Sequence, residues 1–218
     1  MELAKELKNI IKGDVENSEE VLTKYSRDAS LLEVKPLVVV FPKNSEDVCN
    51  LVKWVNKENE KGSKYSITAR SAGTCMAGGA IGESIILDFT KYMNEIKSVE
   101  KVEPFEILPK YPNAHNVKIS GKATVMPGCF YRDFEVATLK ENLLLPCYTA
   151  SKSINAMGGM VGNNSAGEKT LNYGKTEDYV SEVKIVLADG REYTVKSLTK
   201  KELYAKIAQG DFEGELYK

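Results

Sequence analysis

Arg70-Ser71-Ala72-Gly73-Thr74-Cys75-Met76-Ala77-Gly78-Gly79-Ala80 is a glycine-rich stretch between two predicted strands, at residues 65–68 and 84–88. Glycine adopts positive φ angles and lets another group approach the backbone closely. Consecutive N–H groups in such a loop can face one concavity, which suits a phosphate. The stretch is therefore either a turn between strands or a phosphate-binding loop, and taken alone it leaves both interpretations open.

The residues before this stretch predict a small parallel sheet. Helices are predicted over residues 1–12 and from Ser18 onward. An apolar run at residues 37–41 is typical of a buried strand, and residues 45–60, capped by Ser45-Glu46-Asp47, carry apolar side chains at helical spacing. With a further strand at residues 66–69, the order implies a βαβ unit. The glycine-rich stretch then leaves the carboxyl end of a strand, where open α/β sheets bind ligands.

Two common nucleotide-binding motifs are excluded. Residues 73–78 do not spell GxGxxG, and no Lys-Ser/Thr pair follows a GxxxxG span. No amphipathic helix separates Gly79 from the apolar strand at Ile85. Loop amides, rather than a helix dipole, would therefore hold a phosphate here, which leaves a nucleotide site of a different kind.

The second half of the chain predicts a new β region. Strands are predicted from residue 95 to 102 and over residues 122–126, the second ended by Pro127-Gly128. The proline-containing segment 103–116 is expected to be an extended hairpin tip or insertion that carries an exposed, non-catalytic His115. The elements expected after it are a helix over 131–142, a short buried strand over 143–146, exposed turns over 168–178, a hairpin over 179–195 around Asp189-Gly190, a helix over 197–210 and a short acidic end over 211–218.

A second glycine-rich stretch spans residues 151–167 and holds small polar side chains between its glycines. It is either a helix-to-loop junction or a short helix, starting at Ile154, that leaves backbone amides available at its ends. Two such stretches in successive subdomains suit a ligand with two phosphates, bound in the cleft between them.

Composition and charge bound the protein class. The formal net charge is −1 and no basic block occurs, so nucleic acid is not expected as a partner. No apolar run approaches the length of a membrane span, and the N-terminus lacks a signal peptide. Cys49, Cys75, Cys129 and Cys147 are scattered and His115 is the single histidine, which favours reduced thiols in the cytoplasm over disulfides or a metal site.

Several motifs follow one another along residues 20–200. They are Tyr25-Ser26-Arg27-Asp28-Ala29-Ser30, Val40-Phe41-Pro42, Arg70 to Thr74 with Gly78-Gly79, Val125 to Gly128, Pro146 to Ser151, Gly158 to Asn164, Tyr173-Gly174 and Ile185 to Gly190. In this order they resemble the motifs of FAD-linked oxidases, in the vanillyl-alcohol oxidase/p-cresol methylhydroxylase superfamily. The pattern is most similar to D-lactate dehydrogenases and glycolate oxidase flavin subunits.

The resemblance implies an α+β fold of the PCMH type, in which FAD lies between two α/β subdomains. The first is expected to hold a small parallel sheet and the second a larger mixed or antiparallel sheet. The expected division is an N-terminal helical segment (1–20), FAD-binding subdomain 1 (21–94) and FAD-binding subdomain 2 (95–210). A C-terminal substrate or cap domain is expected to be absent from this chain.

The resemblance also implies which residues contact the cofactor. The amides of Ser71 to Ala77 would wrap the pyrophosphate, and Ile185 would meet the adenine with main-chain groups. Thr74 stands where some relatives carry a histidine bonded covalently to the flavin, so non-covalent FAD is expected. No catalytic residue and no metal ligand is assigned. The implied set is Arg70, Ser71, Ala72, Gly73, Thr74, Cys75, Met76, Ala77, Gly78, Pro127, Gly128, Ser151, Gly158, Gly159, Asn163, Ser165, Gly167, Gly174 and Ile185.

The implied function is oxidation of a 2-hydroxy acid of the D-lactate or glycolate type, with electrons passed on to an acceptor. A cap domain or partner subunit would supply the substrate-binding groups, so the chain is expected to be a fragment that alone binds FAD weakly and turns over no 2-hydroxy acid. Its exposed cofactor face could then form a homodimer. The alternative is a non-catalytic FAD-carrying subunit or nucleotide-binding module that acts with a partner chain.

Overall fold

A four-stranded sheet forms the first half of the protein, in a computed structural model that describes residues 2–107 and 117–218. The strands lie in the order β1-β2-β4-β3. β2, β4 and β3 run parallel, as predicted, whereas the short β1 pairs with β2 in the antiparallel sense. Their bounds are β1 Asp14–Glu16, β2 Val38–Phe41, β3 Ile67–Arg70 and β4 Ile85–Asp88.

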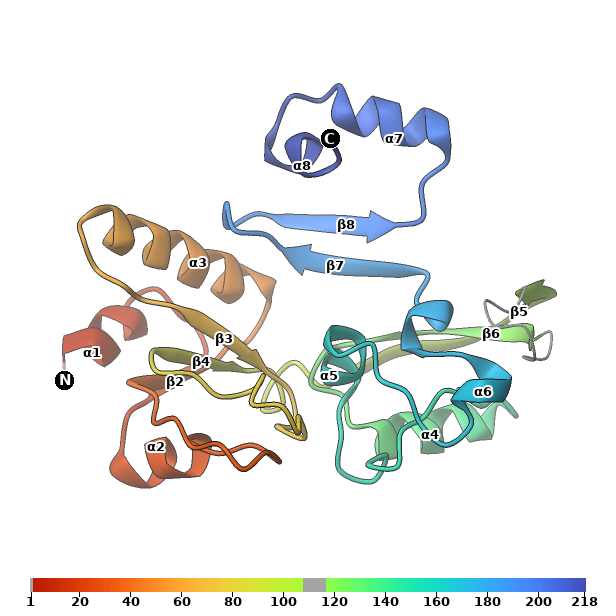
Figure 1. The fold of residues 1–218 in the computed structure, drawn as a ribbon, viewed down its shortest axis with the longest axis horizontal. Coiled ribbons are helices and arrows are strands. Elements are labelled where there is room, and N and C mark those ends of the chain that lie inside the picture. Colours follow the sequence, from red (N-terminus) through yellow and green to blue (C-terminus); the bar gives the residue numbers. More distant parts are fainter. Residues whose placement is uncertain (1, 108–116) are drawn as a thin grey trace.

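Helices cover both faces of this sheet (Figure 1). On one face Leu51 of α3 shares a core with Val38, and on the other Tyr25 of α2 packs with Val39. Successive strand residues point to opposite faces, so burial on both faces explains the continuous apolar run of β2. The helices are α1 Glu2–Lys8, α2 Glu19–Tyr25 and α3 Ser45–Glu60.

The glycine-rich stretch leaves the carboxyl end of β3, as predicted. β3 ends at Arg70 and β4 begins at Ile85. This connection is described in full and contains no helix. Any anion held there would therefore meet loop amides rather than the first turn of a helix.

A long antiparallel hairpin, β5 and β6, lies beside the first half and carries its own core (Figure 1). Tyr131 and Phe134 of α4 pack with Met160 of α5 in that core, against partly buried Val125 of β6. The bounds are β5 Ile96–Ile107, β6 Val117–Val125, α4 Tyr131–Lys140 and α5 Met157–Gly162.

The second hairpin, β7 (Glu182–Val186) and β8 (Glu192–Lys196), turns at Asp189-Gly190 as predicted. Gly190 has φ +73°, which a residue with a side chain rarely adopts. Asn56 Nδ2 of α3 donates to the Ala188 carbonyl at 2.6 Å, so this hairpin packs on the first half. Within the described residues, the expected larger second sheet is thus two separate two-stranded sheets.

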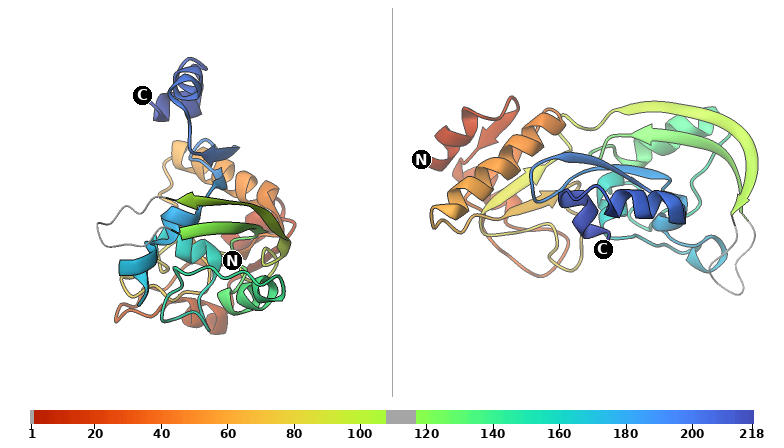
Figure 2. Two further views of the ribbon diagram at one scale, coloured as in Figure 1. Left: turned by 90° about the vertical axis from the view of Figure 1, so that its right-hand side faces the viewer. Right: turned by 90° about the horizontal axis from the view of Figure 1, so that it is seen from above.

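Two short helices at the C-terminus stand apart from the body of the molecule (Figure 2). Thr199 caps the first: its hydroxyl accepts from the Glu202 N–H, and the Glu202 carboxyl accepts from the Thr199 N–H. No helix in the described parts of the chain combines the length and apolarity needed to cross a bilayer. The remaining elements are α6 Thr170–Tyr173, the 3₁₀ helix η1 Thr176–Tyr179, α7 Lys200–Ile207 and α8 Phe212–Leu216.

The predicted strand over residues 143–146 is wrong. The Leu143 side chain packs over Gly121, where an added Cβ would lie 2.3 Å from Leu143 Cδ1. The Leu145 carbonyl accepts a hydrogen bond from the Tyr131 hydroxyl at 2.9 Å, and no strand pairs with this run. An apolar run is therefore anchored here by side chains without becoming part of a sheet.

Other boundaries also differ from prediction. The first helix ends at Lys8 instead of residue 12, and the second glycine-rich stretch becomes helical only at Met157 instead of Ile154. The predicted turn region 168–178 contains α6 and part of η1. β1 and α8 were not predicted. β5 extends into the expected hairpin tip as far as Ile107. Residues 108–116, with His115, lie outside the described residues.

Asp47 connects two loops, the α1–β1 connection and the β2–α3 connection. Its side chain is fully buried: Oδ1 accepts from the Lys12 N–H at 2.8 Å, and Oδ2 accepts from the N–H groups of Gly13 at 3.0 Å and Lys43 at 2.8 Å. Asp47 therefore does not cap its own helix. Asn44 does so, since its side chain accepts from the Asp47 N–H at 3.1 Å.

Replacing Asp47 with alanine should destabilise the fold strongly. The change removes three partly buried hydrogen bonds and leaves their N–H donors without this acceptor, so we expect the free energy of unfolding to fall by about 3 kcal/mol. Urea unfolding followed by circular dichroism measures this. The matched control is Glu46→Ala, which removes an exposed ion pair with Lys12 and should cost less than about 1 kcal/mol. Equal stability of the two variants would contradict the assignment.

Candidate functional site

The two glycine-rich stretches meet at the carbonyl oxygen of Pro127. This oxygen accepts two hydrogen bonds, from Ser71 Oγ at 3.1 Å and from the Gly158 N–H at 2.8 Å. Ser71 belongs to the first glycine-rich stretch, Gly158 to the second, and Pro127 to the turn between β6 and α4. The structure thus brings together three segments that the sequence indicated separately.

Glycine is required where these segments cross. A Cβ on Gly158 would lie 2.7 Å from Pro127 Cβ and 2.8 Å from both Pro127 O and Ser71 Oγ. A Cβ on Gly128 would lie 2.1 Å from the Phe89 carbonyl oxygen, just after β4. Any side chain at either position would push the two halves of the protein apart, so close packing across this junction depends on both glycines.

The loop from Ser71 to Gly79 presents a row of free backbone donors. Within residues 2–107 and 117–218, none of its N–H groups has a hydrogen-bond acceptor. Gly73 and Gly78 have φ angles of +68° and +78°, so the chain curls instead of extending. The residues of this loop are half-buried or exposed, so these N–H groups are accessible to a ligand. A curled row of free amides therefore fits an anion such as a pyrophosphate.

The second stretch contributes shape more than amides. The Met157 and Gly158 N–H groups, at the start of α5, are taken by the carbonyls of Cys129 and Pro127 at 2.8 Å each. The prediction that amides would be available at this helix end is therefore wrong for these two. Gly159 lies beside Ser71: a Cβ added to Gly159 would be 3.6 Å from the Cβ of Ser71. What this stretch offers the loop is a surface without side chains.

Cys75 links the loop to the end of α5. Its Sγ lies 3.9 Å from Asn163 Oδ1, and the Asn163 amide nitrogen donates to the Gly159 carbonyl at 3.1 Å. Met76 is 83% exposed at the loop tip. Ala72, Thr74 and Ala77 lie in the same curled segment. Cys75 and Asn163 are thus a second contact between the two stretches.

The remaining predicted residues lie around this junction in different roles. Ser151 Oγ is 2.9 Å from Thr149 Oγ1, and the Ser165 carbonyl accepts from the Thr176 hydroxyl at 2.7 Å. Gly167 packs against the Tyr148 carbonyl, where a Cβ would lie 2.0 Å away. Gly174 has φ +80° and ends α6, while Ile185 pairs with Tyr193 in the second hairpin. These residues support the segments, and within the described residues none of them is hydrogen-bonded to residues 71–79.

Arg70 donates its hydrogen bonds to main-chain carbonyls. Its Nη1 donates to the carbonyls of Arg27 at 2.9 Å and Ala80 at 3.1 Å, and its guanidinium lies 5.0 Å from the centre of the Tyr25 ring. Asp28 accepts from the Ala80 N–H at 3.4 Å. Sequence reasoning missed Tyr25 and Asp28 as neighbours of the loop, although both lie in a segment that carried the family resemblance.

Burial and hydrogen bonding shift several pKa values near the junction. Burial raises the pKa of the Cys129 and Cys147 thiols to about 11. Burial also acts to raise the pKa of Asp28, but hydrogen bonds from Ser30 and Ala80 and the charge of Arg70 outweigh it, and the net pKa is lowered. The described residues include no group of His, Cys, Asp or Glu suited to a metal ion.

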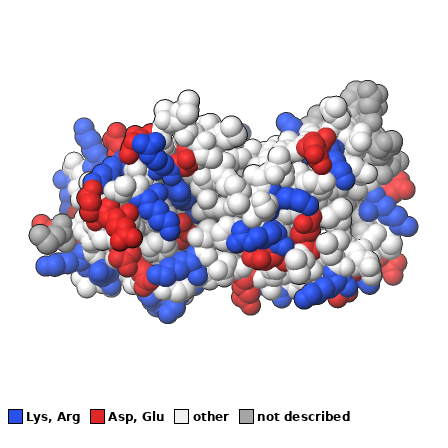
Figure 3. Space-filling model, turned by 90° about the horizontal axis from the view of Figure 1, so that it is seen from below, with Lys and Arg blue, Asp and Glu red and all other residues white. Residues whose placement is uncertain are grey.

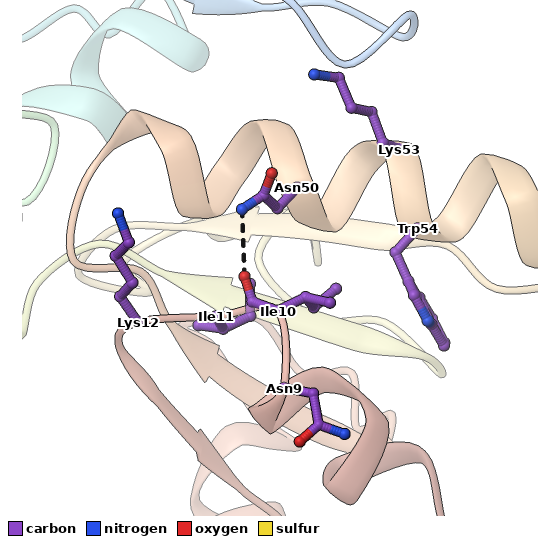
Figure 4. Close-up of a pocket in the computed structure, with 7 residues that line it drawn as sticks. All are labelled: Asn9, Ile10, Ile11, Lys12, Asn50, Lys53 and Trp54. Atoms are coloured by element: carbon purple, nitrogen blue, oxygen red, sulfur yellow. Dashed lines mark hydrogen bonds between the residues drawn. The ribbon is translucent and has the colours of Figure 1, made fainter.

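A separate surface hollow lies between the α1–β1 connection and α3, away from the glycine-rich loop (Figure 4). Within it the Asn50 side chain donates to the Ile10 carbonyl at 3.2 Å. The hollow is lined by Asn9, Ile10, Ile11, Lys12, Asn50, Lys53 and Trp54.

Seen from below, the molecule shows two charged lobes with a largely uncharged middle (Figure 3).

Similar proteins of known structure share this fold. An alkyldihydroxyacetonephosphate synthase superposes with a TM-score of 0.68 at 19% identity, over 93% of this chain and 35% of that one. The 6-hydroxy-D-nicotine oxidase of Arthrobacter nicotinovorans superposes with a TM-score of 0.63 at 19% identity, over 89% of this chain and 38% of its own. These likenesses show the PCMH-type architecture that the sequence predicted.

The chain is similar in sequence to curated proteins that are named as dehydrogenases or as an oxidase subunit. The glycolate oxidase subunit GlcD of Bacillus subtilis is 28% identical over 76% of this chain, and the D-lactate dehydrogenase of Archaeoglobus fulgidus is 30% identical over 74%. The D-2-hydroxyglutarate dehydrogenase of Escherichia coli is 28% identical over 82%. The chain spans 31%, 31% and 16% of the length of these three relatives, respectively.

The profile of one protein family covers most of the chain. It is described as "FAD binding domain" and matches residues 36–196, a range that includes both glycine-rich stretches, the Pro127 junction and the β7–β8 hairpin. The family's cofactor, FAD, carries the pyrophosphate that the free amides of the loop fit. The chain therefore belongs to the FAD binding domain family.

Proposed function

We propose that this chain binds FAD non-covalently at the junction of its two glycine-rich stretches, as the flavin domain of an oxidoreductase that acts on a 2-hydroxy acid. The observation that carries the proposal is the double hydrogen bond to the Pro127 carbonyl. It joins Ser71 and Gly158 and leaves the N–H groups from Ser71 to Gly79 free. The names of the curated relatives support the substrate class.

The chain's own residues would bind and orient the cofactor. The N–H groups of Ser71 to Ala77 would hold the pyrophosphate, with the Thr74 hydroxyl as a further donor. Gly158 and Gly159 would let the cofactor pass close to the backbone, and Ile185 would meet the adenine. When bound, FAD supplies the redox chemistry by accepting a hydride equivalent from the substrate.

Two side chains, those of Thr74 and Cys75, support the proposal that the cofactor is bound non-covalently. Thr74 cannot form the histidyl link that some members of the superfamily carry. Cys75 could bond a flavin in principle, but its Sγ faces Asn163 Oδ1 at 3.9 Å and serves as a contact between the two stretches. Denaturing the loaded protein should therefore release all of its flavin.

We further propose the division into residues 1–20, 21–94 and 95–210, with substrate-binding groups supplied by a cap domain or partner subunit. The electron acceptor would dock on that assembly, and a homodimer could form through the exposed cofactor face. All four cysteines are free thiols, which supports a cytoplasmic location.

Purified protein should bind FAD and fail to reduce a dye with D-lactate or glycolate. Adding the protein to a fixed concentration of FAD should quench the flavin fluorescence. The quenching should reach a saturating endpoint, because the loop binds the pyrophosphate at one site. Riboflavin, which lacks that group, is the matched ligand and should bind at least tenfold more weakly. No saturable quenching by FAD would contradict the proposal, and dye reduction by the chain alone would contradict an external source of substrate-binding groups.

Gly158→Ala should weaken FAD binding by at least tenfold, since its Cβ would collide with Pro127 and Ser71. The matched control is Gly162→Ala in the same helix, where an added Cβ meets nothing within 4 Å. That variant should bind FAD within about twofold of the parent. The affinities come from the same fluorescence titration. Equal affinities for the two variants would argue against the junction as the cofactor site.

FAD should protect Cys75 from alkylation. At pH 8 Cys129 and Cys147 should react slowly, because burial raises their pKa values to about 11 and leaves few of them as thiolates. Cys49 on α3, outside the proposed site, serves as the control. Mass spectrometry after iodoacetamide treatment should show slower labelling of Cys75 with FAD and unchanged labelling of Cys49. Unprotected Cys75 at saturating FAD would contradict the proposed position of the loop.

A further inference from the structure

We infer that Arg70 and Asp28 are positioning residues, which hold the glycine-rich loop in its curled form without touching the phosphates themselves. This inference rests on the proposed FAD site, which it refines by assigning a role to the connector between α2 and β2. The resemblance placed Arg70 among the cofactor contacts, and nothing in the sequence assigned Asp28 a function.

Arg70 closes the loop on itself. It is the residue from which the loop departs, and its Nη1 donates to the carbonyl of Ala80, the residue at which the stretch ends, at 3.1 Å. The same Nη1 donates to the Arg27 carbonyl at 2.9 Å. One guanidinium nitrogen therefore ties the beginning of the loop to its end and to the connector.

The guanidinium lies inside the curl that it holds. An added Cβ on Gly73 would be 2.3 Å from Arg70 Nη2, so the loop backbone passes directly over this group. The other side of the guanidinium faces the Tyr25 ring, 5.0 Å from its centre, an arrangement that stabilises a cation. The guanidinium therefore packs between the Tyr25 ring and the loop, and it fixes the position of the loop backbone that carries the free amides.

Asp28 completes the attachment of Ala80. Its Oδ2 accepts from the Ala80 N–H at 3.4 Å, and its Oδ1 accepts from the Ser30 N–H at 2.9 Å. Ala80 thus has its N–H held by Asp28 and its carbonyl held by Arg70. The Leu32 side chain from the same connector lies against Gly78, 2.7 Å from an added Cβ. The connector therefore forms an outer wall of the loop.

Lysine separates this role from a direct contact with phosphate. Lys keeps the positive charge, so a residue that attracts a phosphate through its charge would be partly rescued by it. A planar group held between a ring and the loop while it donates to two carbonyls cannot be replaced by a compact ammonium. For a positioning residue, Arg70→Lys should be as defective as Arg70→Met.

The test compares FAD affinity and local hydrogen exchange in Arg70→Lys, Arg70→Met and Asp28→Ala. Arg27→Lys is the matched control, because it changes a guanidinium in the same connector, paired with Glu33, and leaves the main-chain carbonyl that Arg70 uses. Both Arg70 variants should lose at least tenfold in FAD affinity. In the free protein, all three test variants should show at least tenfold faster amide exchange around residues 80–82, with exchange in β2 unchanged.

Several outcomes would overturn the inference: FAD affinity restored by lysine relative to methionine, unchanged exchange at residues 80–82, or an equal loss of affinity in Arg27→Lys. Should Arg70→Met fail to fold, Asp28→Ala and Arg70→Lys still decide through exchange. If the parent chain does not bind FAD, the proposed function fails. The exchange measurement on the free protein then separately shows whether Arg70 and Asp28 hold the loop.

Discussion

The carbonyl oxygen of Pro127 accepts hydrogen bonds from Ser71 and Gly158, and the rest of the candidate site depends on this double contact. A carbonyl has two lone pairs, and here each is used by a different part of the chain. The contact requires that no side chain stand at Gly158 or Gly128. The two glycines, together with the Pro127 oxygen that accepts two hydrogen bonds, thereby keep the two halves close enough for one ligand to touch both.

Side chains also take over main-chain hydrogen bonding elsewhere in the first half. Asp47 accepts from three N–H groups in loops that no strand or helix could satisfy. Arg70 and Asp28 together satisfy both main-chain groups of Ala80. The N–H groups from Ser71 to Gly79 have no such acceptor within the described residues. An unbroken row of free donors in a curled loop points to a ligand more strongly than glycine content does.

The position of Arg70 changes how a cation in a phosphate loop is understood. A guanidinium next to a glycine-rich loop invites assignment as an anion ligand. Here its contacts are two carbonyls, an aromatic ring and the loop backbone. Its charge still favours an anion nearby, but its geometry determines where the amides lie. Binding energy for the pyrophosphate would then come chiefly from the main chain, held in place before the cofactor arrives.

The sequence by itself determined the strands with strong local patterns, the two glycine-rich stretches and the family. Residues 38–41 and 85–87 are apolar because both faces of their sheet are covered, so their composition alone predicts that they are buried. Leu143 to Leu145 has the same composition but no strand beside it, and only the tertiary structure decides pairing. Two contacts at the site are of the same kind. Ser71 and Gly158 meet although they are far apart in the sequence, and Arg70 reaches Ala80 because the loop between them curls back. No local pattern encodes such contacts, because they depend on where the other segments come to lie.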